Sequence, residues 1–369
     1  MSLRPARGGP PRRPVLLSWL DGLPTIEAVA HLLARLQARG RLEVRLLLPA
    51  GKFPADSPTR QTLCALGLEP VPISRLRSKF LYGRDLRAAD AVLALTDPAL
   101  DRSSRRLRAG SIMRAGKPVV FVQHGAYAAG VNAPLGGEGR LDYYAQRLLL
   151  WQNTPAEAAI LSEATLRNVR VTGFLKQPFL PFAPVHPAVA AWQARHPHRV
   201  LLCQSFRWRT PRYTADHIAD WYRQLDAFLA RHRDIGVLLR PHRGKANRRH
   251  SAHDEALRDR HPNLLVSLDD GGPLHGAAIH DCIALCDTVV CPESTVVLDA
   301  LYLDRPVLVS DIQSLIFPEL PRVESMDDIA RLIREPDLAR RAGDAVRARY
   351  GTLADNLERA CDHIEAVVA

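Results

Sequence analysis

The chain has 369 residues, a length that suggests about two domains, each with a core of its own. Its hydrophobic fraction of 47% is typical of a globular protein, and its apolar runs, such as Val15–Trp19, are too short to cross a bilayer. Fifty Lys and Arg against 39 Asp and Glu give a formal charge of +11. This charge favours an anionic partner, whether a phosphorylated metabolite, an acidic membrane or a nucleic acid.

The sequence lacks the motifs that are typical of several functional classes. The six cysteines include no C-x-x-C pair, so we expect no zinc site and a reducing, cytoplasmic environment. No G-x-G-x-x-G, G-x-x-x-x-G-K-[ST], H-E-x-x-H or Asp-x-Asp motif occurs, which argues against a dinucleotide oxidoreductase, a P-loop nucleotidase and a zinc protease. Aromatic residues make up only 6% of the chain, so we expect no nucleic-acid partner. We predict neither a metal nor a cofactor.

Residues 1–13 are predicted to form a disordered basic arm. The first fourteen residues contain Arg4, Arg7, Arg12, Arg13 and four prolines, without the continuous apolar stretch of a secretory signal. Contact with an acidic membrane surface is the alternative interpretation. It would place the protein peripherally on the inner face of the cell membrane.

From Pro14 onward, apolar runs of strand length alternate with amphipathic runs of helix length, as in parallel sheets covered by helices. A helix is predicted over Thr25–Arg39, with Thr25 as N-cap and Glu27 in the first turn, where a negative charge suits the helix dipole. Residues 14–176 therefore predict one Rossmann-like domain. Its predicted strands are Pro14–Trp19, Leu42–Pro49, Glu69–Ile73, Ala91–Thr96, Pro118–Gln123, Leu148–Gln152 and Val169–Thr172.

A proline-rich segment over residues 177–187 predicts an interdomain linker, because its regularly spaced prolines stiffen the chain and prevent a continuous helix. A second alternation over 188–340 predicts a second Rossmann-like domain, with a cleft between the two domains. Residues 341–369 complete a helical C-terminal tail that begins near Met326. The predicted elements of the second domain are strands Arg199–Gln204, Gly236–Arg240, Asn263–Leu268, Thr288–Cys291 and Pro306–Val309, and helices Thr214–His232, Ala277–Cys286 and Thr295–Leu303.

Polar residues gather at three predicted strand ends, where open α/β sheets bind ligands. At the first, four apolar residues lead to His124 and Gly125. The glycine-rich segment that follows suits a substrate entrance, although a histidine that caps a loop is the alternative interpretation. Gly22, after the first strand, is a second candidate for an acceptor-side loop. The glycines of the segment are Gly125, Gly130, Gly136, Gly137 and Gly139.

The second strand end carries Arg240, Pro241 and His242. Arg240 offers a planar fork of donors for phosphate oxygens, and Pro241 fixes the approach to His242. A surface salt bridge at a strand exit is the alternative interpretation. The basic run that follows is either a solvated face or steers an anionic acceptor; it comprises Arg243, Lys245, Arg248, Arg249 and His250.

The third strand end leads through Pro292 and Glu293 to Ser294 and Thr295, where a helix is predicted to begin. Free N–H groups and hydroxyls at a helix start are suited to a phosphate. Ordinary N-capping by Ser294, with Glu293 as a favourable charge, is the alternative. Asp299 is predicted to be structural or donor-binding. The pair Asp269-Asp270 precedes two glycines and is most simply a turn.

Taken together, the two-domain alternation and the three strand-end motifs resemble the GT-B glycosyltransferases. The resemblance is strongest to the group of CDP-glycerol glycerophosphotransferases and capsule-polysaccharide transferases. In that group a His-Gly-Thr motif ends an N-domain strand, Arg-Pro-His-Pro follows in the C-domain, and Asp-Tyr-Ser-Ser opens the helix that holds the donor phosphates. In this chain Ala126 replaces the Thr, Arg243 replaces the second Pro, and Pro292-Glu293 replaces Asp-Tyr.

The resemblance implies a role for each motif. His124 is expected to be the catalytic base in an N-terminal acceptor domain. In the C-terminal donor domain, Arg240 and His242 are expected to contact the nucleotide or its phosphates. Ser294 and Thr295 are expected to bind phosphate, with Glu293 as a further donor-binding residue.

The implied reaction is a metal-independent displacement on a nucleotide-activated donor, linked to CMP, CDP or UDP. It transfers a sugar or glycerophosphate unit to the hydroxyl group of a glycan or lipid-linked acceptor in bacterial cell-surface polysaccharide biosynthesis. A sugar-nucleotide 2-epimerase is the main alternative. An inactive carbohydrate-binding relative is another.

Overall fold

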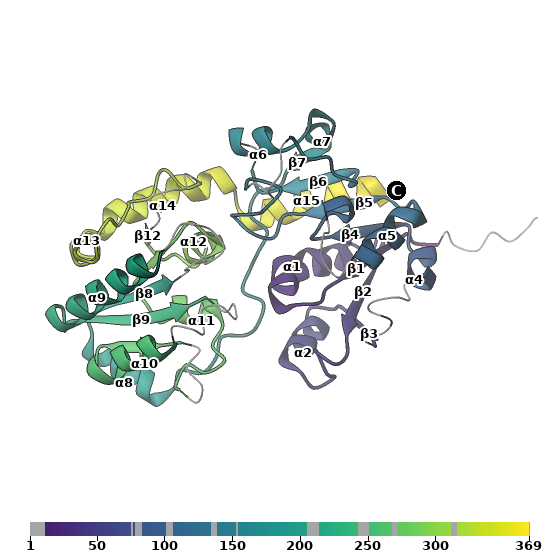
Figure 1. Cartoon of the computed structure of the whole chain (residues 1–369). Helices are drawn as coiled ribbons and strands as arrows, with labels where there is room; N and C mark the ends of the chain where they lie inside the picture. Colours follow the sequence, from purple (N-terminus) through teal and green to yellow (C-terminus); the bar gives the residue numbers. More distant parts are fainter. Residues whose placement is uncertain are drawn as a thin grey trace, which may run out of the picture. The chain divides into compact units, whose positions relative to one another are not determined.

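The structure of the protein is a computed structural model that describes residues 12–74, 77, 83–100, 106–133, 139–152, 154–204, 214–242, 251–267, 272–310 and 316–368. The chain forms two compact α/β units (Figure 1). The first unit comprises Met1–His124, Ala128–Leu180 and Gly351–Ala369. The second comprises Gly125–Tyr127 and Pro181–Tyr350. The main passage between the units thus falls inside the proline-rich segment 177–187.

The first unit is built on a parallel sheet. Its strands are β1 (Val15–Trp19), β2 (Glu43–Pro49), β3 (Val71–Ile73), β4 (Ala91–Ala94), β5 (Val119–Val122), β6 (Arg147–Leu150) and β7 (Val169–Val171). They form a seven-stranded sheet with the order β3-β2-β1-β4-β5-β6-β7, and each described pair is parallel. The order reverses between β1 and β4, as in a doubly wound sheet.

Helices cover both faces of this sheet, which explains why its strands are apolar on successive residues. Leu16 belongs to a core with α1 (Leu23–Arg39), α2 (Pro58–Ala65) and α15 (Leu353–Val368). Leu17 belongs to a second core with α4 (Gly83–Ala88) and α5 (Arg106–Ala115). The remaining helical segments are η1 (Pro98–Leu100), α6 (Pro155–Ile160) and α7 (Glu163–Arg167).

The second unit repeats the plan with fewer strands. These are β8 (His198–Gln204), β9 (Ile235–Pro241), β10 (Leu264–Val266), β11 (Thr288–Cys291) and β12 (Val307–Val309). They form a five-stranded sheet with the order β10-β9-β8-β11-β12, and the described pairs are all parallel. The order reverses between β8 and β11.

The helices of the second unit also lie on both faces of its sheet. Val200 and Leu202 pack in a core with α9 (Ala215–Arg231), α10 (Ser251–Arg260) and α13 (Met326–Leu332). On the other face α8 (Pro187–Arg195) packs against β9, and α12 (Thr295–Leu301) packs against β11 and β12 and beside α11 (Ile279–Ala284). The predicted helical tail comprises α13, α14 (Pro336–Tyr350) and α15, of which α14 belongs to the second unit and α15 to the first.

The predicted fold of two parallel α/β domains with a C-terminal helical tail is confirmed, but some helix ends differ. Thr25 is not the N-cap of α1: the helix begins two residues earlier, with Gly22 as N-cap, and has no acidic residue in its first turn. Pro24 accounts for the earlier start, since its fixed φ suits the first helical turn. Among the described residues, no helix combines the length and apolar character needed to span a membrane.

Candidate functional site

The carboxyl edge of the second sheet brings together several of the predicted site residues. The strand order reverses between β8 and β11, and such a reversal is where open α/β sheets bind ligands. Cys203 on β8 is the register partner of Arg240 on β9. Val200 and Leu202 point into the core with α9, α10 and α13. Because side chains alternate along a strand, Cys203 points to the other face of the sheet, where α11 and α12 lie. Arg240 lies on the same face, beside the reversal.

Arg240 is buried, and no carboxylate among the described residues pairs with it. Only 6% of the residue is exposed. Its Nη1 donates to the carbonyl oxygen of Ala277 at 3.1 Å and to the Sγ of Cys282 at 3.2 Å. Within the described part of the chain Arg240 forms no ion pair, so the alternative of a surface salt bridge is wrong.

The thiols around Arg240 do not compensate its charge. Burial raises the pKa of the Cys203 thiol to about 12, although the positive charge of Arg240 acts in the opposite direction. Cys203 is therefore neutral at physiological pH. Among the described residues, the hydrogen bonds of the Arg240 guanidinium go to a carbonyl oxygen and a thiol rather than to a carboxylate.

A buried hydrogen-bond chain holds the end of β8. Gln204 Nε2 donates to the Tyr222 hydroxyl at 2.8 Å, and that hydroxyl donates to Asp254 Oδ1 at 2.7 Å. Burial raises the pKa of Asp254 to about 6. These hydrogen bonds could not be predicted from the sequence, because their members come from β8, α9 and α10 and only the fold brings them together.

Helix α12 begins at Thr295 as predicted, with Ser294 as N-cap residue. The Ser294 side chain makes no capping hydrogen bond, so ordinary side-chain N-capping does not explain it. The Oγ1 of Thr295 accepts a hydrogen bond from the Ala126 backbone N–H at 3.0 Å; Ala126 is grouped with the second unit. The hydroxyl proton of Thr295 can still be donated to another acceptor.

Glu293 has a structural environment. It is buried, and its Oε1 accepts from the Phe317 backbone N–H at 3.1 Å and pairs with Arg322 at 3.3 Å. Its Oε2 is buried without a hydrogen-bond partner. These contacts tie the loop before α12 to the segment that follows residue 315, so a direct contact with a donor stays a prediction.

The other residues predicted in the second unit are only partly described. His242 is exposed directly after β9, and Asp299 is half-buried on α12. Asp299 lies close enough to Cys203 and Cys291 to contribute to the raised pKa of both thiols, although burial is the main cause. Asp269-Asp270 and the basic run from Arg243 to His250 lie outside the described residues.

In the first unit, His124 is exposed two residues after the end of β5, at the carboxyl edge of the sheet. Gly22 lies at the carboxyl end of β1, and its carbonyl oxygen accepts from the N–H groups of Thr25 and Ile26. The neighbouring Asp21 pairs with Arg108 at 3.4 Å, and Arg108 lies 4.0 Å from the ring centre of Trp19. Gly22 is thus part of a well-contacted helix start.

The described part of the glycine-rich segment is held by hydrogen bonds. The Gly130 N–H donates to the Ala133 carbonyl at 2.7 Å, and the Tyr143 hydroxyl donates to the Gly130 carbonyl at 2.9 Å. The Ala128 N–H donates to Asn132 Oδ1 at 2.8 Å. Gly136 and Gly137 lie outside the described residues.

Asp97, at the carboxyl end of β4, is a buried carboxylate that the sequence analysis missed. Its oxygens accept from the N–H groups of Ala99, Tyr144 and Ala145 at 2.9–3.0 Å. Burial raises its pKa. Its position directly after an apolar strand was a signal, but Tyr144 and Ala145 are far away in sequence. Asp97 fixes the segment that leads into β6.

The comparisons with known proteins show similarity in structure only. No family model matches the sequence. No curated protein sequence matches it either.

Solved structures are similar along nearly the whole chain. The S. aureus MnaA–UDP co-structure has a TM-score of 0.63 at 14% identity and covers 95% of this chain and 96% of its own. The UDP-GlcNAc 2-epimerase from Neisseria meningitidis, bound to UDP-GlcNAc, has a TM-score of 0.57 at 11% identity, with coverages of 95% and 99%. The glycosyltransferase VinC in complex with dTDP has a TM-score of 0.51 at 14% identity, with coverages of 96% and 99%. The chain therefore has the two-domain GT-B fold that these glycosyltransferase and epimerase structures share.

Proposed function

We propose that the protein is a transferase that moves a sugar or glycerophosphate unit from a CMP-, CDP- or UDP-linked donor to a hydroxyl group. The acceptor is a glycan or a lipid-linked glycan of a bacterial cell-surface polysaccharide pathway. The donor binds at the carboxyl edge of the second sheet. Support for a nucleotide ligand comes from the similar structures, which hold UDP, UDP-GlcNAc and dTDP.

The observation that carries this proposal is the buried guanidinium of Arg240, which pairs with no carboxylate in the part of the chain that the structure describes. Burying a charge costs several kcal/mol unless another charge or several hydrogen bonds compensate it. Within the described residues, the hydrogen bonds of Arg240 go to the carbonyl oxygen of Ala277 and the thiol of Cys282. A donor phosphate supplies the missing negative charge, and its oxygens match the planar donor fork of arginine.

The same residues suit the chemistry of the leaving group. A nucleotide phosphate departs with negative charge, and preorganised donors in a dry site stabilise such charge strongly. Arg240 provides the cation, the Ser294 and Thr295 hydroxyls provide donors, and His242 provides an imidazole at the end of the same strand. Transfer of a sugar by direct displacement inverts its anomeric carbon.

His124 takes the proton of the acceptor hydroxyl in this proposal. His124 is exposed at a strand end, and imidazole as a chemical group is suited to general-base catalysis near neutral pH. As the proton leaves, the hydroxyl oxygen attacks the donor and the bond to the nucleotide phosphate breaks. The proton ends on His124, and the electron pair of the broken bond leaves with the phosphate.

A sugar-nucleotide 2-epimerase is the second candidate, because the UDP-GlcNAc 2-epimerase structure has the same fold. An epimerase changes its nucleotide sugar without an acceptor, whereas the transferase needs one for efficient turnover. Incubating the protein with CMP-, CDP- and UDP-activated donors, with and without glycan acceptors, separates the two. Acceptor-dependent nucleotide release supports the transferase, and an acceptor-independent epimer detected by NMR supports the epimerase. Donor binding without any turnover would identify an inactive relative.

The donor site is tested by calorimetry with CMP, CDP and UDP. Arg240→Gln is expected to weaken nucleotide binding by about 1–3 kcal/mol, the usual effect of losing a charge-assisted hydrogen bond. Arg199→Gln is the matched control: Arg199 lies at the start of β8, and its Nη2 pairs with Asp287 at 2.6 Å. We expect this control to bind nucleotide like the wild type. Equal affinity of the wild type and the Arg240→Gln variant, with both folded by circular dichroism, would refute the donor site.

A further inference from the structure

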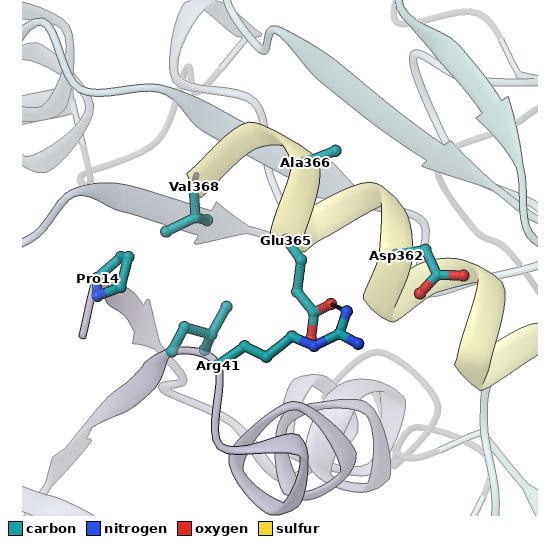
Figure 2. Close-up of a pocket in the computed structure, with 7 residues that line it drawn as sticks. Pro14, Arg41, Asp362, Glu365, Ala366 and Val368 are labelled. Atoms are coloured by element: carbon teal, nitrogen blue, oxygen red, sulfur yellow. Dashed lines mark hydrogen bonds and ion pairs between the residues drawn. The ribbon is translucent and has the colours of Figure 1, made fainter. Parts of the chain in front are cut away.

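Helix α15 separates its charges onto two sides. The acidic side carries Glu358, Asp362 and Glu365 and faces α1. Arg39 pairs with all three of these carboxylates, and Arg41 pairs with Glu365 at 2.9 Å. Figure 2 shows the Arg41–Glu365 pair beside a cavity of about 350 Å³ that is otherwise lined largely by apolar residues. The acidic side of α15 is therefore neutralised within the first unit.

The other side of α15 is basic, and the strands that it faces are basic too. Val120 and Leu149 lie in the core that α15 covers. Val120 is the register partner of Arg147 on β6, and Leu149 is the register partner of Arg170 on β7. Register partners point to the same face of a sheet, so both arginines lie on the α15 side.

Arg359 and His363 complete this group from α15. The two residues are four apart, so they lie on the same side of the helix. Arg359 Nη1 donates to the Thr172 carbonyl oxygen, just after β7, at 3.4 Å. Helix α15 also packs against β6. We call Arg147, Arg170, Arg359 and His363 the edge cluster.

Within the described chain, the edge cluster has no carboxylate partner. Arg170 donates to the carbonyl oxygens of Arg167 and Val169, and Arg359 to that of Thr172. The Nε of Arg147 is buried without a hydrogen-bond partner. Asp362, the acidic residue adjacent to His363, is paired with Arg39.

The titration behaviour of the cluster agrees with this geometry. Burial lowers the pKa of His363, and repulsion from Arg147 and Arg170 lowers it further, against a smaller opposing effect of Asp362. Burial and repulsion from Arg170 lower the pKa of Arg147. The four side chains thus lie close enough to repel one another. Like charges that face each other without an anion destabilise the fold.

We propose that the edge cluster is an anion site that binds a phosphate monoester group, separately from the donor site. Several guanidinium groups from different elements are suited to the oxygens of one phosphate dianion. The buried Nε of Arg147 provides a donor that no protein group uses. A phosphate bound here relieves the repulsion between α15 and the edge strands β6 and β7. The phosphate belongs either to a soluble molecule or to a lipid headgroup.

The test compares the wild type with the double variant Arg147→Gln/Arg170→Gln. Inorganic phosphate is titrated by calorimetry in an Arg240→Gln background at constant ionic strength, so that the donor site does not contribute. The double variant is expected to bind phosphate at least about tenfold more weakly, since each lost charge-assisted hydrogen bond has roughly that effect. Without phosphate its Tm is expected to rise, because the repulsion is removed. Arg114→Gln, an exposed arginine on α5, is the matched control and is expected to change neither result.

Histidine-selective NMR gives a local readout. Phosphate is expected to shift the His363 signal, assigned with His363→Gln, and to leave it unshifted in the double variant. Co-sedimentation with phosphatidate vesicles distinguishes a lipid headgroup from a soluble phosphate: lipid binding that the double variant loses assigns the headgroup, and its absence assigns a soluble ligand. Unchanged phosphate affinity in the double variant, or a lower Tm without phosphate, would overturn the site. Arg147→Gln alone is the fallback if the double variant does not fold.

Discussion

Arg39 and Arg240 show two opposite ways to place a guanidinium inside this protein. Arg39 lies between α1 and α15 and donates to Glu358 and Asp362. Burial alone would lower its pKa, but these hydrogen bonds outweigh burial and raise it. Arg240 is buried at the end of β9 and contacts the Ala277 carbonyl oxygen and the Cys282 thiol. One arginine is paired with carboxylates, and the other contacts no carboxylate among the described residues.

The difference indicates what each arginine does. A guanidinium paired with several carboxylates is compensated by the fold itself, so it needs no ligand. A buried guanidinium without a carboxylate costs stability, and such costs are typical of functional sites. Arg147 resembles Arg240 in pairing with no carboxylate among the described residues, and its Nε is buried without a hydrogen-bond partner. The presence of a carboxylate partner, rather than burial or charge alone, thus distinguishes structural arginines from candidate ligand-binding ones.

The largest effect is expected on turnover, when the group proposed to transfer the proton is removed rather than a charged arginine. His124→Ala is expected to reduce turnover by about 10²–10⁴-fold, the range typical of a positioned general base. Because His124 is exposed, the variant is expected to fold and to bind nucleotide like the wild type. Steady-state kinetics with the best donor and acceptor, together with calorimetry, measures both quantities.

His198→Ala is the control for this experiment. His198 begins β8, at the amino end of a strand, where no ligand is expected. It should retain wild-type turnover. Wild-type turnover in His124→Ala as well would show that the acceptor proton is removed by another group.

The next effect tests the two arginines directly by unfolding in urea. Arg39→Met is expected to lower the free energy of unfolding by about 1–2 kcal/mol, because it leaves the carboxylates of α15 facing an apolar side chain. Arg240→Met is expected to change it by less than about 1 kcal/mol, or to raise it, since a buried charge without a partner is removed. The two variants carry the same substitution, so the difference between their free energies of unfolding reports the environments of the two arginines.

A strong loss of stability in Arg240→Met would contradict the comparison. It would mean that the carbonyl oxygen of Ala277 and the thiol of Cys282 compensate the guanidinium fully, and that Arg240 is a structural residue. A neutral Arg39→Met would mean instead that solvent screens the pairs on α15.

The fold was predictable because its signals are local. Each strand of the two sheets contains a short apolar run, and Gly40 ends α1 as glycine commonly does. Helix α8 was not predicted, because Pro187, its first residue, was assigned to the linker. Short helices such as α2 and α6 escaped prediction, because one or two turns carry too few residues for a clear 3.6-residue period. The start of α1 was misplaced because Thr25 is an equally good capping residue, two positions inside the helix.

Candidate site residues could be picked out from the sequence only at strand ends. Arg240, His124 and Ser294 follow apolar runs, and that pattern is visible in the sequence. The pairing state of a residue depends on elements far apart in the chain and is not visible there. Glu293 was predicted to bind the donor, but its environment shows a structural contact with Arg322, which comes from the segment after β12. Cys282 meets Arg240 from a different element in the same way.

A smaller effect on Tm is expected from a change of pH. It involves two histidines, His363 of the edge cluster and His196 of the second unit. Burial lowers the pKa of His196 below 6.5, and repulsion from Arg195 adds to it. The pKa of His363 is lowered in the same direction. The unfolded chain therefore binds more protons below about pH 6.5, so the stability present above that pH is lost as the pH falls toward the folded-state values. We expect a lower Tm at about pH 5.5 than at about pH 7.5.

Asp254 acts in the opposite direction. Its pKa is raised from 3.8 to about 6, so its stabilising contribution is present below 3.8 and is lost as the pH rises through about 6. His196→Asn and His363→Gln should therefore reduce the acid-induced fall in Tm, and Asp254→Asn should increase it. Identical pH profiles in all three variants would show that other groups control the acid response.

The smallest expected effect is that of metal removal, for which we predict no change. Enzymes that hold a donor diphosphate through a metal commonly use closely spaced carboxylates, and this sequence has no Asp-x-Asp pair. Arg240 provides a fixed positive charge that can neutralise the departing phosphate in place of an ion. Turnover should therefore persist in excess EDTA, and Arg240→Gln should not be rescued by Mg²⁺ or Mn²⁺. Loss of turnover in EDTA and its recovery on adding either ion would instead assign the charge to a metal, with Asp269 and Asp270 as the first carboxylates to mutate.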